Sequence, residues 1–364
     1  MDDTKLLNSA EPRESRFGLS GLLRWLPKYG LLAFTAALIV AFSLLLPNTF
    51  PTAFTFRSIL NEESVYALAA LAVMVPMAAN HFDLSVGYML GMAQVLGMGL
   101  QSIMGLPPWL TVLLVLCFGA CVGIINGLLV TRAKIDSFIA TLGTGTVVYG
   151  LNLWYTGGQE ITGNLPQSFT NIANSPFGIP LPAVYVLVAG LTLWLVFEYF
   201  PLGRHLYVLG SNPRAAELNG ISAKKNVTLA FTVSGVLASI AGLVLVAQLQ
   251  VGESSVGPDY LLPSFTAALL GATTIKPGRV NVWGTILAVL LLSVAIAGLQ
   301  QMGAQYFVQP LFDGLMLIIA VGLSGVVIRR RKERVVKVSK DDTGDVGIDA
   351  GSQGQETGGN ASHE

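Results

Sequence analysis

Long apolar runs, separated by short polar turns, occupy the chain between Leu31 and Ile328. A helix needs about 20 apolar residues to cross the hydrocarbon core of a bilayer. Ten segments meet or approach this length, and they predict an all-α, polytopic membrane protein with about ten transmembrane helices. The predicted spans are residues 30–47, 62–80, 84–104, 109–131, 137–156, 182–200, 226–250, 261–275, 282–302 and 308–328.

The same pattern divides the chain into three parts. Residues 1–29 form a polar N-terminal segment, residues 30–328 the transmembrane domain, and residues 329–364 a basic flank with a disordered tail. The tail is rich in Gly, Asp and Ser and has no apolar periodicity, which is typical of disorder.

Composition excludes a soluble globular protein. Of the 364 residues, 52% are hydrophobic and only 12% are charged, whereas a soluble domain has about 25% charged residues. Cys117 and Cys121 lie four residues apart in one apolar run, so they share a helix face and are expected to be small buried hydrophobes. A metal site would need more ligands. We expect neither a metal nor a cofactor.

The distribution of Lys and Arg orients the predicted helices. Short cytoplasmic loops are enriched in these residues. With ten helices and the N-terminus inside, 20 of the 21 basic residues fall in cytoplasmic segments and only Arg57 falls outside. The outer loops at 157–181 and 251–260 contain acidic but no basic residues. The sequence therefore predicts that both termini are cytoplasmic.

One long polar interruption, residues 201–226, contains several basic residues and lies between two apolar runs. Asn212 or Ser211 can cap a short helix that begins at Pro213, and Gly220 can end it. Such a helix of about two turns is marginal in water by itself. It therefore needs a surface to pack on, and we expect this loop to contact a partner.

Two polar clusters interrupt the predicted spans. Asp83 and Ser85 lie between two helices, where an ionisable side chain must be buried in protein or face water. Asn126, Thr141 and Thr144 flank a short basic loop. Both clusters fit helix packing as well as a polar path. Asp83, Ser85, Asn126, Thr141 and Thr144 are the candidate residues of a translocation path.

The sequence has no G-x-x-x-x-G-K-[ST] motif, so the chain does not hold ATP phosphates itself. Energy must come from a partner or from an ion gradient. An ion-coupled secondary transporter would need acidic residues in its spans, and only Asp83 and Glu198 are credible. An intramembrane protease and a structural scaffold are further alternatives. Residues 322–325 resemble the nucleophile motif of rhomboid proteases, but nothing places a histidine beside Ser324.

Four ordered motifs carry a resemblance to a known family. The runs HFDLSVG, NGLLVTRAKIDSFIATLGT, GRHLYVLGSNPRAAELNGI and GATTIKPGRVNVWGT resemble signature stretches of the permease subunits of ribose-type sugar ABC importers. The resemblance covers residues 30–328. Two stretches depart from the family pattern, at Asn80–Phe82, where two glycines are usual, and at Lys276–Arg279. These departures leave the identity of the sugar open.

The resemblance implies a homodimeric permease in the bacterial inner membrane that is not itself an enzyme. It implies import of ribose, another pentose or a related monosaccharide from the periplasm, with lipid around the chain and no nucleic-acid partner. A periplasmic sugar-binding protein would deliver the sugar, and a separate ATP-binding subunit would dock on the loop 201–226. The residues expected to contact that subunit are Asn212, Arg214, Ala215, Ala216, Leu218, Gly220 and Ile221.

Overall fold

The computed structural model describes residues 19–323 and 325. Residues 1–18 of the N-terminal segment, Ser324, the basic flank and the predicted disordered tail lie outside the described residues.

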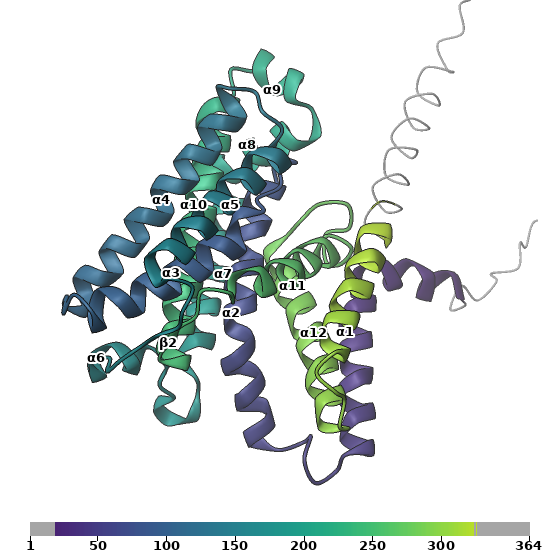
Figure 1. Cartoon of the computed structure of the whole chain (residues 1–364). Coiled ribbons are helices and arrows are strands. Elements are labelled where there is room, and N and C mark those ends of the chain that lie inside the picture. The colour runs from purple at the N-terminus through teal and green to yellow at the C-terminus, as the bar shows by residue number, and fades with distance from the viewer. Residues whose placement is uncertain (1–18, 324, 326–364) are drawn as a thin grey trace, which may run out of the picture.

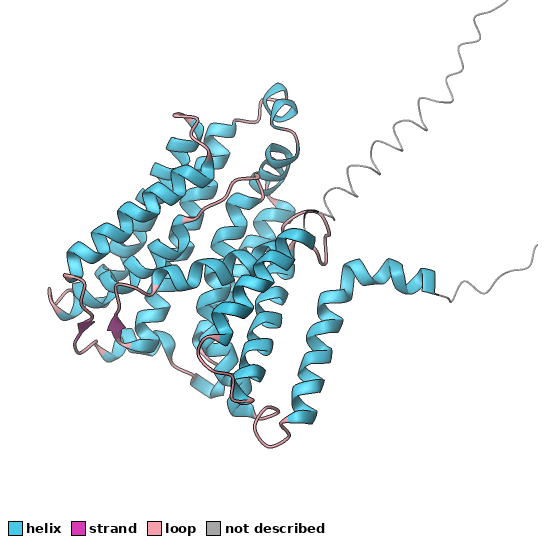
Figure 2. Cartoon of the chain, turned by 45° about the vertical axis from the view of Figure 1, so that its right-hand side comes forward, coloured by secondary structure: helices cyan, strands magenta, loops and turns pink. Residues whose placement is uncertain are grey.

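Most of the described chain is helical (Figure 2). The long helices are α1 (Leu19–Leu45), α2 (Ala53–Met77), α3 (Ser85–Ser102), α4 (Pro108–Thr131), α5 (Ser137–Thr156), α7 (Leu181–Tyr199), α10 (Ala223–Leu249), α11 (Gly257–Gly271) and α12 (Val282–Gln301). A further apolar helix, named here the C-terminal helix, spans Val308–Leu323. The short elements are α6 (Gln167–Thr170), η1 (Asn171–Ala173), η2 (Pro176–Gly178), α8 (Pro201–Ser211) and α9 (Pro213–Leu218), with antiparallel strands β1 (Ile161–Thr162) and β2 (Val251–Gly252).

Each predicted span contains one helix, so the all-α prediction is confirmed. Five of the described helices, α2, α4, α7, α10 and α12, are long and apolar enough to cross a membrane by length and composition. The chain is therefore a multi-pass membrane protein, and the total of ten spans stays a prediction. Several boundaries differ from the prediction. For example, α2 begins at Ala53 rather than residue 62, because the Thr52 hydroxyl accepts a hydrogen bond from Thr55 N (3.1 Å) and caps the helix.

Helix α10 packs against α2, α3 and α4 in the middle of the bundle (Figure 1). Its contact with α4 is close because glycines recur every fourth residue of α4, at Gly119, Gly123 and Gly127, and so share one face. A Cβ at Gly119 would lie 2.5 Å from the carbonyl oxygen of Gly235 in α10, and a Cβ at Gly127 would lie 2.5 Å from Thr228 Cα. The two backbones are therefore in direct contact, as small residues permit between helices in lipid.

The two cysteines of α4 correct one expectation. Cys117 and Cys121 are free and exposed in the chain rather than buried. They lie in α4 between and beside the glycines that pack on α10, but their own side chains lie away from that contact. The apolar run of α4 is exposed over much of its length, as a lipid-facing helix would be.

The bundle has two different ends (Figure 1). One end, the basic end, contains α8, α9, the α4–α5 turn and the α11–α12 turn. The other, the strand end, contains α6, β1 and β2. Of the nine Lys and Arg whose side chains the structure describes, eight belong to the basic end: Arg132, Lys134, Arg204, Arg214, Lys224, Lys225, Lys276 and Arg279. The ninth, Arg57, contacts Gly178 in the long loop that also contains α6.

The α4–α10 contact gives a stability prediction. Replacing Gly123 with Ala should lower the thermal unfolding midpoint of the detergent-purified protein, because the new Cβ overlaps the Phe231 carbonyl of α10. Such overpacking typically costs about 1–3 kcal/mol. The matched control is Gly150→Ala on α5, where nothing lies within 4 Å of the added carbon. Equal midpoints for the two variants would contradict the close approach of α4 and α10.

Candidate coupling surface and translocation path

Local capping chemistry builds α9 as the sequence predicts. Asn212 Oδ1 accepts a hydrogen bond from Ala215 N (3.0 Å), and Pro213 is the first helical residue. Gly220 has a left-handed backbone with φ +74°, which ends the helix and favours glycine. The predicted short helix, its cap and its stop are therefore confirmed.

Helix α8, directly before α9, was expected to be polar loop. It buries Leu206 and Leu209 against the bundle. Two glycines bring its backbone close: Gly203 lies on the end of α7, and Gly210 lies on Ala78 and Ala79 at the end of α2. The spacing of Leu202, Leu206 and Leu209 was the signal for an amphipathic helix. As a result, α9 is preceded by a helix that packs on the bundle rather than by a free loop.

The expected partner-contacting residues differ in exposure. Asn212, Arg214, Leu218 and Gly220 are exposed, and Ala215 and Ile221 are half-buried. Leu218 is 78% exposed, whereas Ala216 is 0% exposed. Ala216 packs inward on the chain and cannot touch a partner in this conformation.

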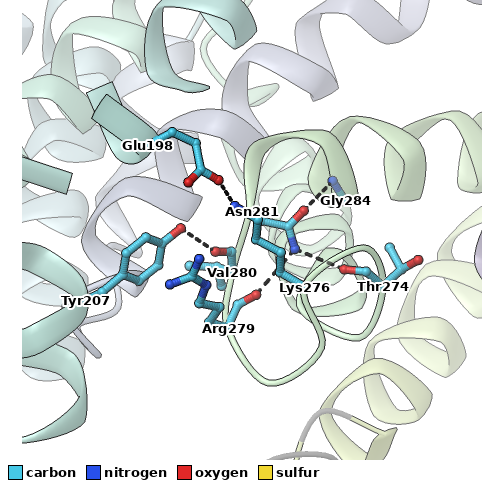
Figure 3. Close-up of polar contacts among 8 residues, drawn as sticks. All are labelled: Glu198, Tyr207, Thr274, Lys276, Arg279, Val280, Asn281 and Gly284. Atoms are coloured by element: carbon cyan, nitrogen blue, oxygen red, sulfur yellow. Dashed lines mark hydrogen bonds and ion pairs between the residues drawn. The ribbon is translucent and has the colours of Figure 1, made fainter. Parts of the chain in front are cut away.

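A group of four side chains fastens α8 and the end of α7 to the α11–α12 turn (Figure 3). The Tyr207 hydroxyl donates to the carbonyl of Val280 (2.8 Å), and the guanidinium carbon of Arg279 lies 4.5 Å from the centroid of the Tyr207 ring. Lys276 forms an ion pair with Glu198 at the end of α7. We name these four side chains, Glu198, Tyr207, Lys276 and Arg279, the turn clasp. Burial raises the pKa of Tyr207 while nearby Arg279 opposes the shift, so the phenol stays protonated and can donate.

A buried amide, Asn281, holds the α11–α12 turn itself in place (Figure 3). Its Nδ2 donates to the carbonyls of Gly271 and Thr274 (both 3.0 Å), and its Oδ1 accepts from Gly284 N (2.8 Å) to cap α12. Sequence reasoning did not single out Asn281, although Asn before an apolar run is a helix-start signal. The clasp therefore links α8 to a turn that is internally fixed.

The five candidate path residues lie together, although up to 61 positions separate them in sequence. Asp83 Oδ1 accepts from the backbone N (3.0 Å) and the hydroxyl (2.6 Å) of Ser85. Asn126 Nδ2 donates to the Ser85 hydroxyl (2.8 Å), and the Thr144 hydroxyl donates to Asn126 Oδ1. This polar network joins the break between α2 and α3 to α4 and α5.

Thr141 makes a second link between α5 and the segment that joins α2 to α3. Its hydroxyl accepts from Leu84 N (3.0 Å) and donates to the carbonyl of Ser137 (2.7 Å). Apart from half-buried Thr144, the network residues are at most 2% exposed. Their groups largely satisfy one another, so the arrangement accounts for the structure of the break, and a path role stays a prediction.

Two acidic side chains inside helices were missed. Glu63 in α2 and Asp313 in the C-terminal helix line one cavity of about 20 Å³, together with Tyr66 and Gln309. The expectation that only Asp83 and Glu198 are acids near the spans is therefore wrong. It failed because both residues lie close to the ends of the predicted apolar runs. The cavity has room for about one water molecule.

Comparison with known proteins decides the family. The family model described as "Branched-chain amino acid transport system / permease component" matches residues 55–321. The ribose import permease protein RbsC of Bacillus subtilis (strain 168) is 32% identical over 286 residues, which cover 78% of this chain and 88% of that protein. The chain belongs to the permease family of ribose-type ABC importers.

Two further relatives support the same family. The RbsC protein of Escherichia coli (strain K12) is 30% identical over 307 residues, covering 82% of this chain and 93% of that protein. The autoinducer 2 import system permease protein LsrD of Klebsiella pneumoniae is 33% identical over 260 residues, covering 70% and 78%. No solved structure matches the chain. The resemblance read from the four motifs is confirmed, and a transport permease is a membrane subunit rather than an enzyme.

The polar network gives a second stability prediction. Asn126→Leu removes one hydrogen bond to the Ser85 hydroxyl and one from the Thr144 hydroxyl, and at about 0.5–1.5 kcal/mol for each bond the loss should cost about 1–3 kcal/mol. The effect is read as a lower unfolding midpoint of the purified protein. Thr146→Val is the control, since this exposed hydroxyl bonds only the Leu142 carbonyl of its own helix. An unfolding midpoint of Asn126→Leu equal to that of Thr146→Val would show that the network does not stabilise the segment between α2 and α3.

Proposed function

We propose that the chain is the transmembrane subunit of an importer that moves ribose or a related monosaccharide from the periplasm to the cytoplasm, powered by a separate ATP-binding subunit. The observation that carries the proposal is α9, a capped, exposed helix on the basic end of a chain whose relatives are named as ribose import permeases. The lack of a P-loop in the sequence agrees with an external source of energy.

The charge distribution supports one orientation. Eight of the nine described basic residues belong to the basic end, which supports a cytoplasmic location of that end because Lys and Arg prefer short inner loops. In this arrangement the chain has ten spans and two cytoplasmic termini in the bacterial inner membrane. The strand end then faces the periplasm and a sugar-binding protein.

Coupling to the ATP-binding subunit would run through α9 and the turn clasp. Leu218 offers an exposed apolar side chain that can enter a groove, with Arg214 and Asn212 beside it. A displacement of α9 moves α8, and the Tyr207–Val280 contact passes that motion to the turn between α11 and α12. The Glu198–Lys276 pair ties the same turn to the end of α7. Packed helices then shift as rigid bodies.

Two copies of the chain would form the permease, each presenting one α9 to an ATP-binding subunit. The sugar would cross between them. In this arrangement half-buried Thr144 is the member of the polar network nearest to an accessible surface, and Asp83, Ser85, Asn126 and Thr141 support it from behind.

An ion-coupled secondary transporter is the second candidate, and the cavity that contains Glu63 and Asp313 favours it. Acidic side chains within helices are the usual carriers of coupling ions in such proteins. The two candidates differ in their source of energy, so one experiment separates them.

Reconstitution in liposomes tests the proposed function. Ribose uptake should require the ATP-binding subunit, the binding protein and ATP together, and should be unaffected when proton and sodium gradients are collapsed. The measurement is accumulation of labelled ribose. Uptake by the chain alone, driven by an ion gradient, would instead establish the secondary transporter.

The role of Leu218 is tested separately. Leu218→Glu should leave the purified permease folded but abolish co-purification of the ATP-binding subunit, because a charge replaces an apolar anchor at a contact. Leu218→Met keeps an apolar side chain of similar volume and should retain assembly. Normal assembly and uptake by Leu218→Glu would rule out this docking contact.

A further inference from the structure

An open pocket of about 330 Å³ lies at the strand end, far from α9. It falls within the size range of small-molecule sites, about 300–1,000 Å³. Its walls come from α2, from the segment of α6 and η1, and from the last turn of α10 and the residue that follows it. The residues that line it are Asn61, Gln167, Thr170, Asn171, Ala173, Asn174, Ala247, Gln248 and Gln250.

The chemistry of the described lining is uniform. Six side chains are amides, one is a hydroxyl, two are alanine methyl groups, and none is charged. A side-chain amide offers two donors and an acceptor oxygen, which matches the alternating donors and acceptors of sugar hydroxyls. An amino acid or a phosphorylated sugar would find no opposite charge among these residues. The set favours a neutral, polyhydroxylated solute.

One of these polar side chains holds the wall of the pocket together, and others make no hydrogen bond within the described chain. Gln248 Nε2 donates to the carbonyl of Asn61 (2.7 Å), which ties α10 to α2 and forms one wall. The amide nitrogen of Asn171 and the side chains of Gln167 and Gln250 make no hydrogen bond to other described residues. These exposed groups remain available to a solute.

We propose that this amide pocket receives a neutral monosaccharide at the outer face of the permease, before the sugar enters the path between the two chains. The inference rests on the proposed function and adds a binding site to it. The pocket is open and its described lining has no aromatic ring on which a sugar could stack. Both features give weak, readily released binding, as a passage requires.

Protection from cysteine labelling tests the site on the full chain in nanodiscs. The background is Cys117→Ala with Cys121→Ala, because both native thiols are exposed. In this background, ribose should slow the reaction of Asn171→Cys with a polar maleimide. At a ribose concentration about ten times the dissociation constant, labelling should slow about tenfold because only the free site reacts. Leucine should give no protection.

The control for this experiment is Asn164→Cys, an exposed position in the same loop that does not line the pocket. Equal labelling of Asn171→Cys with and without ribose would overturn the proposal. Protection of both cysteines by ribose, or protection of Asn171→Cys by leucine, would also overturn it.

A transport assay provides the second readout. In liposomes with saturating binding protein, Asn171→Leu should lower the maximal rate of ribose uptake about two- to tenfold, the effect of one lost hydrogen bond. Asn171→Gln keeps the amide and should restore most of the rate. Both variants should assemble normally with the ATP-binding subunit, since Asn171 lies at the other end of the chain from α9.

The pocket and the proposed function fail in different ways. ATP-driven ribose uptake by the unchanged chain, without protection of Asn171→Cys and with a normal rate for Asn171→Leu, would remove the pocket alone. Absence of uptake of any sugar would remove the proposed function, whereas the nanodisc labelling would still report whether the pocket binds ribose.

Discussion

Backbone contact between helices is the constraint on which this structure depends. In lipid, apolar side chains gain little from leaving one apolar environment for another, so helices associate through close packing and hydrogen bonds. Helix α10 meets this constraint at Gly235 against α4 and at Gly242 against the Leu90 carbonyl of α3. These contacts fix α10 in the middle of the bundle. The short helix α9 and the amide pocket then lie at opposite ends of a single fixed element.

Much of the fold followed from the sequence because each helix carries its own signals. Apolar length located the spans, Pro108 began α4, and Gly157, with φ +63°, ended α5. The failures share a physical cause. Helix α8 mixes charged and apolar residues and is recognisable only by the face it buries, and the two-residue strands β1 and β2 exist only through pairing of distant loops.

In the candidate sites, too, the sequence predicted local features but not which way each side chain points. Polar residues in apolar runs identified Asp83, Ser85 and Asn126 as a group, because such residues must find partners in the bundle. Which way a side chain points in a six-residue helix is a tertiary property. The small size of Ala216 suggested a contact with a partner, but it serves burial within the chain, while Leu218 carries the exposed apolar surface. The amide pocket draws its residues from three segments that are far apart in sequence, in α2, around α6 and η1, and at the end of α10, so no local pattern shows it.

The position of Gly235 has a mechanical consequence. Helix α10 has 27 residues, so it is about 40 Å long, and Gly235 lies close to its midpoint, where it touches Gly119 of α4. Thr228, before it, touches Gly127 of α4, and Gly242, after it, touches Leu90 of α3. A rod held at several points along its length does not tilt by itself. Any movement of its first turn, beside α9, must therefore carry α3 and α4 with it as one block.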